Sequence, residues 1–163
     1  MQQDFRCNCP FTSALDVLGD KWILVIIKQI LIEGKETFKD FTEADEAIAT
    51  NILSAKLKIL EEVGLIIKTQ RPDNKKTNLY LLTEKGLSLT PILVELATWS
   101  DKNLRDIHPT IVNGEAMDFL RNDKTAFANE IEKSYREKLA TTSPIRKQGF
   151  RVYNVKPKCT KVG

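Results

Sequence analysis

Residues 48–65 have the sequence IATNILSAKLKILEEVGL, in which apolar side chains recur with the period of an α-helix. With about 100° per residue, the apolar side chains fall on one broad arc. This arc contains Ile52, Leu53, Leu57, Ile59, Leu60 and Val63. The opposite arc contains Asn51, Ser54, Ala55 and Lys58. The pattern predicts a helix that packs on one side and leaves a small, polar face outside.

A β-hairpin is predicted directly after this helix. Gly64 is expected to end the helix, and residues 65–69 are rich in the β-branched side chains that favour strands. Residues 71–77 are basic and turn-forming, and residues 78–82 supply a returning strand. Residues 83–86 predict a short capped helix.

Three helices are predicted before residue 48. A first helical pattern covers residues 10–18, and Gly19 and Asp20 break it. Residues 22–31 are apolar on nearly every face, which is typical of a helix buried at the centre of a domain, and Gly34 ends it. Thr37 can cap a short helix over residues 37–41.

Further helices are predicted after the hairpin. Thr90 is the expected cap of a longer helix, with Pro91 in its first position. Its apolar stripe contains Ile92, Leu93, Leu96 and Trp99. Two more helices are expected over residues 115–120 and 123–139, and a brief strand over residues 150–155. The predicted organisation is an arm (1–9), a main domain (10–108), a helical extension (109–140) and a basic, flexible tail (141–163).

Length and composition are typical of a globular protein. The chain has 163 residues, of which 42% are hydrophobic and 29% charged. We expect a cytoplasmic protein without membrane contact, because there is no long apolar run and no signal-peptide pattern. Three cysteines are too few for a disulfide framework. The net charge of +3 is uneven: residues 141–163 hold six Lys or Arg and no acid, so functional arguments must use local charge.

The order of these elements predicts the function class. Helix, buried helix, short helix, amphipathic helix, strand, basic turn, strand and helix is the order of a winged helix-turn-helix. We therefore predict a mainly α fold with a small β-hairpin, a winged helix-turn-helix with a C-terminal helical extension. Small hydrogen-bonding side chains let a helix read double-stranded DNA in its major groove, and a basic turn contacts phosphates. The candidate DNA-binding residues are Thr50, Asn51, Ser54, Ala55, Lys58, Arg71, Lys75 and Lys76.

Other interpretations stay open. Taken alone, an amphipathic helix is more often a packed helix, and a basic hairpin is more often a solvated turn. The rival function is a winged helix that binds a protein partner, which an exposed apolar face would mark. Lys56 falls at the edge of the packed arc, with its ammonium expected toward solvent or phosphate, and is a weaker DNA candidate than Lys58. We expect no enzyme, cofactor or metal site, because no catalytic or metal motif is present.

The sequence resembles the HxlR family of bacterial winged-helix regulators, relatives of the MarR type, from Cys9 to Trp99. The matching segments are Cys9-Pro10, residues 18–22, residues 38–41, residues 48–54, Lys56-Leu57, Leu60-Glu61 and residues 80–86. The resemblance implies a homodimer on a pseudo-palindromic operator. The implied dimer contacts are Leu15, Leu96 and Trp99. Two positions depart from the family pattern, which usually has a basic residue at Thr37, an expected phosphate contact, and often a glycine at Ala47.

The resemblance also implies a reactive cysteine. In several members of the family, the cysteine that matches Cys9 senses quinones, aldehydes or oxidants, and Cys7 is a candidate second thiol. Thiolate reactivity requires a lowered pKa, for which Arg6, Lys21 and the N-terminus of the first helix are candidate causes. The alternative is that Cys9 is a small packing residue at a dimer interface.

Two further side chains limit the metal hypothesis. A metal site at Cys7 and Cys9 would have only His108 and Cys159 as further nitrogen or sulfur ligands, so it is the weaker interpretation. His108 itself is expected to be solvated at the end of the long helix. The sequence identifies no small-molecule effector.

Overall fold

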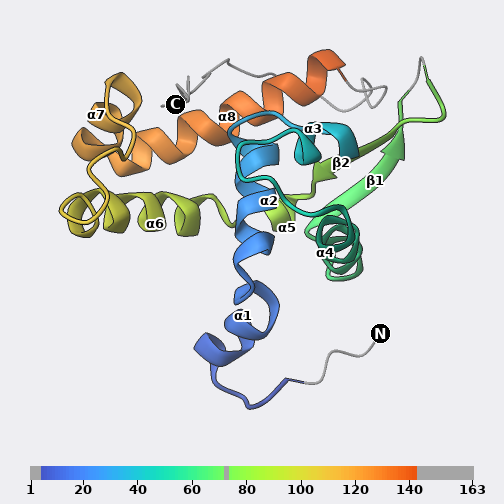
Figure 1. Ribbon diagram of the computed structural model, residues 1–163, viewed down its shortest axis with the longest axis horizontal. Coiled ribbons are helices and arrows are strands. Elements are labelled where there is room, and N and C mark those ends of the chain that lie inside the picture. Colours follow the sequence, from blue (N-terminus) through green and yellow to red (C-terminus); the bar gives the residue numbers. More distant parts are fainter. Residues whose placement is uncertain (1–4, 72–73, 143–163) are drawn as a thin grey trace. The chain divides into compact units, whose positions relative to one another are not determined.

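The computed structural model describes residues 5–71 and 74–142, and the chain divides into two compact units between Leu87 and Ser88 (Figure 1). The first unit contains α1 (Pro10–Leu18), α2 (Lys21–Leu31), α3 (Phe38–Thr42), α4 (Thr50–Glu62), β1 (Ile66–Gln70), β2 (Asn78–Leu82) and α5 (Glu84–Leu87). The second contains α6 (Thr90–Asn103), α7 (Glu115–Asn122) and α8 (Lys124–Thr142). The fold is the predicted mainly α winged helix-turn-helix with one hairpin. The expected strand over residues 150–155 lies outside the described residues.

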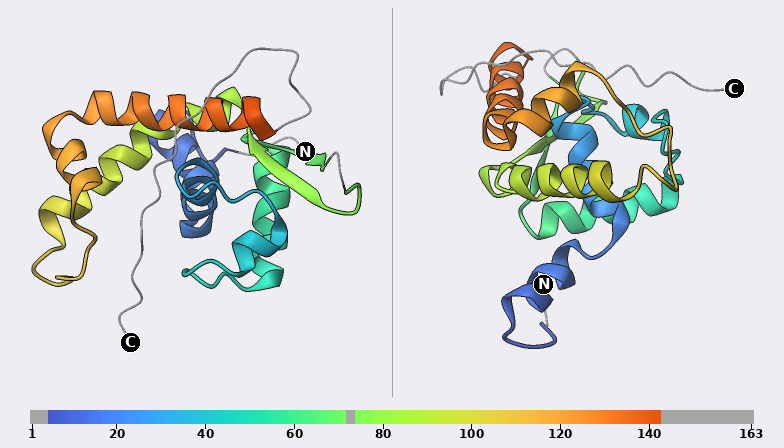
Figure 2. Two further views of the ribbon diagram at one scale, coloured as in Figure 1. Left: turned by 90° about the horizontal axis from the view of Figure 1, so that it is seen from above. Right: turned by 90° about the vertical axis from the view of Figure 1, so that its left-hand side faces the viewer.

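Helix α2 is at the centre of the first unit. Its N-terminus is capped by Asp20, whose Oδ1 accepts a hydrogen bond from the Trp22 amide at 2.9 Å. Its buried residues are Ile23, Ile26, Ile27, Gln29, Ile30 and Leu31. Helix α4 and strand β2 both contact α2, and Figure 2 gives two further views of the ribbon in which these elements can be followed by colour. The prediction of a central buried helix is confirmed, although the helix begins one residue earlier, at Lys21.

The hairpin pairs β1 and β2 in antiparallel register, from Ile66 opposite Leu82 to Gln70 opposite Asn78. Strand β1 therefore begins one residue later than predicted, because Leu65 belongs to the end of the preceding turn. The Tyr80 amide donates to the Glu36 carbonyl at 2.8 Å, so the segment before α3 extends the hairpin. The Tyr80 ring also packs edge-on against Phe41, with centroids 6.1 Å apart.

Helix α4 begins at Thr50, two residues later than the apolar pattern predicted. Ile48 is buried but precedes the helix, and Ala49 is the N-cap in an extended conformation. Ala47 has a φ of 48°, in the left-handed region where a glycine is less strained. This conformation gives a physical reason for the glycine that the family often has at this position.

The packed arc of α4 is narrower than predicted. Its buried residues are Leu53, Leu57 and Leu60. Ile52 and Val63 are half-buried, and the Ile59 side chain is 36% exposed. The prediction that Ile59 is packed is therefore wrong, because contacts with the core reach only one stripe of the helix.

The predicted caps have mixed outcomes. Thr37 caps α3 in a reciprocal capping box with Asp40, as expected, so the Thr37 hydroxyl is engaged within the fold. Thr83 Oγ1 accepts from the Gly86 amide at 3.1 Å at the start of α5. The expectation that Thr90 caps α6 is wrong. Leu89 is the N-cap, and the fully buried Thr90 is already the first helical residue.

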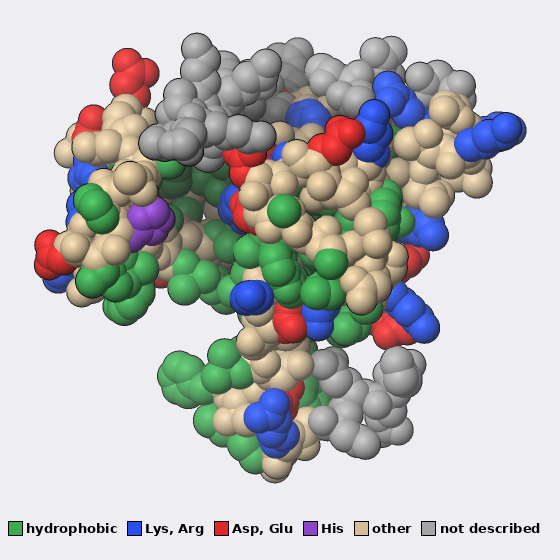
Figure 3. Space-filling model, in the orientation of Figure 1, with side chains coloured by type: hydrophobic (Ala, Val, Ile, Leu, Met, Phe, Trp, Pro, Cys, Tyr) green, Lys and Arg blue, Asp and Glu red, His purple; other side chains and the backbone are tan. Residues whose placement is uncertain are grey.

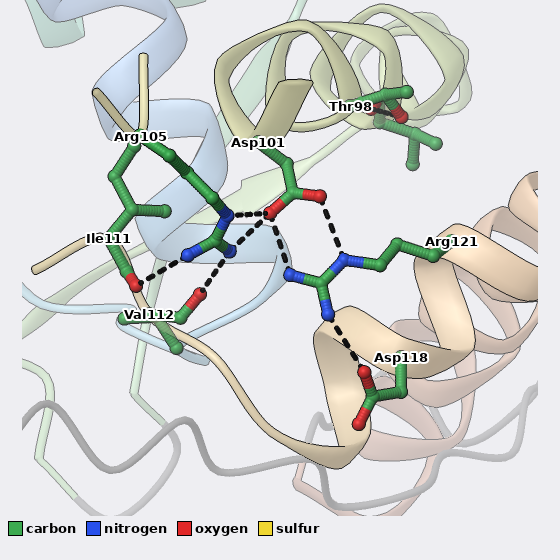
Figure 4. Close-up of polar contacts among 8 residues, drawn as sticks. Thr98, Asp101, Arg105, Ile111, Val112, Asp118 and Arg121 are labelled. Carbon is green, nitrogen blue, oxygen red and sulfur yellow. Dashed lines mark hydrogen bonds and ion pairs between the residues drawn. The ribbon is translucent and has the colours of Figure 1, made fainter. Parts of the chain in front are cut away.

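The second unit is held by an ionic network around Asp101 (Figure 4). The Asp101 carboxylate accepts from Arg121 Nε and Nη2 of α7 at 2.8 Å each, and from Arg105 Nε at 2.8 Å. Hydrogen bonds from Arg121 and then Arg105 hold the pKa of Asp101 well below its usual range. Arg105 also donates to the carbonyls of Ile111 and Val112. This network joins α6 to α7 and to the loop between them.

We predict that two glycine substitutions destabilise the first unit to different extents. A Cβ at Gly86 would lie 2.2 Å from the Leu65 carbonyl oxygen, so Gly86→Ala should lower the free energy of unfolding by at least about 2 kcal/mol. At Gly64 there is open space but a φ of 71°, so Gly64→Ala should cost only about 1 kcal/mol. Urea denaturation followed by circular dichroism measures both, and equal costs would contradict this account.

Candidate nucleic-acid interface

The outer face of α4 has the size and polarity that base contacts require. Thr50, Asn51, Ser54, Ala55 and Lys58 are all exposed, as the sequence pattern predicted. Ala49, the N-cap of α4, makes no side-chain hydrogen bond to the amides of the first turn, which are groups that can bind an acceptor such as a phosphate. The arrangement presents small hydrogen-bonding groups at the end of the helix where the dipole favours anions.

The two lysines of α4 have different environments. Lys56 Nζ lies 2.8 Å from Asp20 Oδ2, and its side chain is mostly buried. The expectation that its ammonium faces solvent or a phosphate is therefore wrong, because the ammonium forms an ion pair with Asp20, the residue that caps α2. Hydrogen bonding to Lys56 lowers the pKa of Asp20 below its ordinary value. Lys58 is 76% exposed and lies 3.8 Å from Glu62 one turn later, so it is the better candidate for DNA.

The connection between β1 and β2 carries basic side chains away from the core. Arg71, Lys75 and Lys76 are exposed, and basic side chains are visible at the end of the hairpin in Figure 3. The described part of the turn is closed by hydrogen bonds from the Lys76 amide to Asn74 Oδ1 and from the Asn74 amide to the Arg71 carbonyl. The predicted wing therefore carries three exposed basic side chains of the kind that contact a phosphate backbone.

The C-terminal end of α4 is fixed by the segment that follows the hairpin. Gly64 turns the chain with a positive φ, and the Leu65 amide donates back to the Leu60 carbonyl at 2.9 Å. Thr83 Oγ1 donates to the Gly64 carbonyl at 2.7 Å, and Lys85 Nζ donates to the Val63 carbonyl at 2.7 Å. The motif at residues 83–86 therefore closes the end of the recognition-like helix.

The N-terminal end of α4 is preceded by a turn that contacts α2. Glu46 Oε2 accepts from Gln29 Nε2 at 2.7 Å, and Glu46 Oε1 pairs with Lys28 Nζ. Burial alone would raise the pKa of Glu46, but hydrogen bonds from Lys28 and Gln29 hold it below its ordinary value. Burial would likewise lower the pKa of Lys28, but hydrogen bonds to Glu33 and Glu46 raise it. The pair is therefore charged.

Sequence reasoning missed the side chains that hold α4 from outside the helix. Asp20, Glu46 and Lys85 were not proposed as site residues. A cap signal was visible for Asp20, which precedes the buried helix, but its second partner is distant in sequence. Glu46 and Lys85 resemble ordinary surface charges in a sequence, and only the fold brings them to their partners.

Cys9 is the N-cap residue of α1, and both Cys7 and Cys9 are exposed. Hydrogen bonds from the Thr12 amide, the Thr12 hydroxyl and the Phe11 amide lower the pKa of the Cys9 thiol. The helix N-terminus is therefore a cause of the shift, as predicted. Arg6 and Lys21 are not among its causes, because Arg6 pairs with Asp16 at 2.7 Å and Lys21 lies over the Trp22 ring. The Cys9 amide lies 3.4 Å from Cys7 Sγ.

Within residues 5–71 and 74–142, no helix is long and apolar enough to cross a membrane. In the same ranges, no three His, Cys, Asp or Glu side chains are grouped so that they could hold a metal ion.

Comparison with known proteins agrees with this geometry. The family model of the HxlR-like helix-turn-helix matches residues 17–108. The HTH-type transcriptional regulator YodB of Bacillus subtilis is 34% identical over 95 residues, which are 58% of this chain and 84% of YodB. The solved structure of the redox regulator HypR in its reduced form is 28% identical, with a TM-score of 0.52, over 63% of this chain and all of HypR.

A second solved structure, a MarR-family regulator from Porphyromonas gingivalis W83, is 31% identical, with a TM-score of 0.53. It covers 60% of this chain and 94% of that structure. Residues 17–108, which the family model matches, contain the central helix α2, the candidate recognition helix α4 and the hairpin of β1 and β2. This chain therefore belongs to the HxlR-like helix-turn-helix family of transcriptional regulators.

Proposed function

We propose that this transcriptional regulator reads a specific, pseudo-palindromic operator as a homodimer. The observation that carries the proposal is the division of α4 into a buried apolar stripe and an exposed face of Thr50, Asn51, Ser54, Ala55 and Lys58. Asn51 and Ser54 can hydrogen-bond base edges, and Ala55 permits close approach. The basic wing supplies contacts that do not depend on sequence.

The rival function is a winged helix that binds a protein partner. Its requirement is an exposed apolar surface on α4, and within the outer face the side chains are small or polar. Ile59 is the exposed large apolar residue of α4, and it lies in the half of the helix away from Thr50. The composition of this face favours DNA.

Base reading and phosphate binding should separate in mutants. We expect Asn51→Ala and Ser54→Ala to weaken binding to the selected operator by about 1–3 kcal/mol each while hardly changing binding to random duplex. Lys75→Ala and Lys76→Ala should weaken both and flatten the dependence of affinity on salt. Salt-titrated gel shifts with both duplexes measure this difference. Equal losses on both duplexes for Asn51→Ala would favour the rival function.

Dimerisation is proposed from unpartnered apolar side chains on α1 and α6. The exposed fractions are 65% for Leu15, 47% for Leu96 and 58% for Trp99. Hydrophobic side chains gather over α1 in Figure 3. Exposed apolar patches of this kind mark interaction surfaces, and a two-fold dimer would match a pseudo-palindromic operator.

We predict that Leu15→Glu with Trp99→Glu converts the dimer to a monomer, because two charges would be buried at the interface. Sedimentation equilibrium should show half the wild-type mass, with the helix content retained in circular dichroism. Ile107→Glu is the matched control, since Ile107 is exposed but lies outside α1 and α6. A wild-type chain that sediments as a monomer would refute the dimer.

Redox sensing through Cys9 is the third part of the proposal. Two observations support it. The Cys9 thiol is exposed and its pKa is lowered, and the chain is similar to HypR, a redox regulator with solved structures of its reduced and oxidised forms. In this scheme the Cys9 thiolate takes an oxygen atom from a hydroperoxide and gives a sulfenic acid and an alcohol or water. The Cys7 thiol then displaces water from the sulfenic acid and forms a disulfide.

Cys9→Ser should abolish any effect of oxidants on operator affinity. Cys7→Ser should stop the reaction at the sulfenic acid, which a dimedone adduct in mass spectrometry would reveal. Gel shifts before and after hydroperoxide treatment provide the functional readout. If Cys9→Ser responds to the oxidant as the wild type does, Cys9 is a structural residue.

A further inference from the structure

The turn between α3 and α4 is tied to the buried helix α2 by one carboxylate. Glu46 Oε2 accepts from Gln29 Nε2 at 2.7 Å, and Glu46 Oε1 pairs with Lys28 Nζ. Lys28 and Gln29 are successive residues of α2. Both oxygens of the carboxylate therefore bind the most buried helix of the unit, just before the chain enters α4.

The other contacts of the turn are local, such as the hydrogen bond from the Ala47 amide to the Ala44 carbonyl at 2.9 Å. Ala47 has a φ of 48°, in the left-handed region, and this conformation is unfavourable for a residue other than glycine. The N-cap residue Ala49 makes no side-chain hydrogen bond to α4. The buried Ile48 holds the turn by apolar contact, which has no preferred direction. The hydrogen bonds of the Glu46 carboxylate are directional, and they join this turn to α2.

Gln29 is poorly explained as a residue that only stabilises the core. Its side chain is fully buried, and Oε1 has no hydrogen-bond partner among the described residues. A buried amide with one unpaired end costs stability compared with an apolar side chain of similar size. The bond from Nε2 to Glu46 gives this glutamine a second role.

We propose that Glu46 is a positioning residue for DNA reading, because its contacts with Lys28 and Gln29 place the N-terminal end of α4 and hence Asn51. The inference rests on the proposed function above. A reading helix must be held to about 0.5 Å, so a small shift of the turn is sufficient to impair base contacts. Glu46 itself contacts no DNA in this scheme.

The chain offers a matched control for Glu46. Glu33 also binds Lys28 Nζ, but it follows α2 and does not belong to the turn before α4. Glu33→Gln and Glu46→Gln therefore change the net charge equally and each remove one carboxylate from the same lysine. They differ in that Glu46→Gln leaves the turn with at most one of its two contacts with α2, because an amide has a single acceptor oxygen, whereas Glu33→Gln also removes the ion pair with Lys35.

The test compares both variants of the full chain on the selected operator and on a random duplex of the same length. Glu46→Gln should lose about tenfold in operator affinity and less than about twofold on random duplex, whereas Glu33→Gln should keep the wild-type ratio. In an Asn51→Ala background, the operator effect of Glu46→Gln should shrink to less than about twofold, because the two residues act on the same contact.

A readout without DNA accompanies the binding assay. Amide hydrogen exchange over residues 50–54 should be faster in Glu46→Gln than in the wild type and unchanged in Glu33→Gln. If Glu46→Gln fails to fold, Lys28→Met keeps the Gln29 bond and should give a smaller change in the same direction.

Three results would overturn the inference. The first is an operator preference in Glu46→Gln equal to that of the wild type, and the second is an equal loss on both duplexes. The third is full additivity with Asn51→Ala. A wild-type chain that prefers no sequence overturns the proposed function itself, and the inference with it. That result is distinct from preference retained in the variant.

Discussion

The fold of the first unit depends on the burial of the isoleucines of α2, the helix that α1, α4 and β2 all contact. Burying an isoleucine side chain contributes roughly 1.5–3 kcal/mol, so the row of isoleucines in α2 gives a large part of the driving force for folding. Such burial decides which elements come together and which face of α4 points inward. Polar contacts add directional restraints on the position of α4.

The second unit achieves its order by a different kind of contact. The Asp101 carboxylate accepts hydrogen bonds from Arg105 and Arg121. Arg105 also donates to two carbonyl groups of the loop between α6 and α7. Both arginine side chains are partly exposed, so solvent screens these pairs and each ion pair adds little stability. A bidentate arginine still restricts geometry. The network is therefore better understood as a device that orders a loop than as the source of the fold's stability.

Periodicity predicted the elements well because it reports burial along one chain segment. Helix α1, strand β2, the Thr37 cap and the exposed set on α4 all follow from local pattern. The errors have other causes. Lys56 was expected to face solvent or a phosphate and Ile59 to pack, and both outcomes depend on which distant residues lie beside α4. Thr90 was expected to cap α6, but the helix begins one residue earlier than that expectation, with Leu89 as its N-cap. Arg6 was expected to lower the pKa of Cys9, but it forms an ion pair with Asp16 instead.

The polar anchors of α4 follow from the demands on a reading helix. The side chains on its outer face must remain small, so no bulky group on that face can attach the helix to the rest of the domain. Its buried stripe consists of only three leucines. Anchors must then lie at the flank and the two ends. Lys56 binds Asp20 on the flank, Glu46 binds α2 from the preceding turn, and Lys85 binds the carbonyl of the C-cap residue Val63. Three directional contacts at separated points add to the restraint that apolar packing places on the tilt and rotation of the helix.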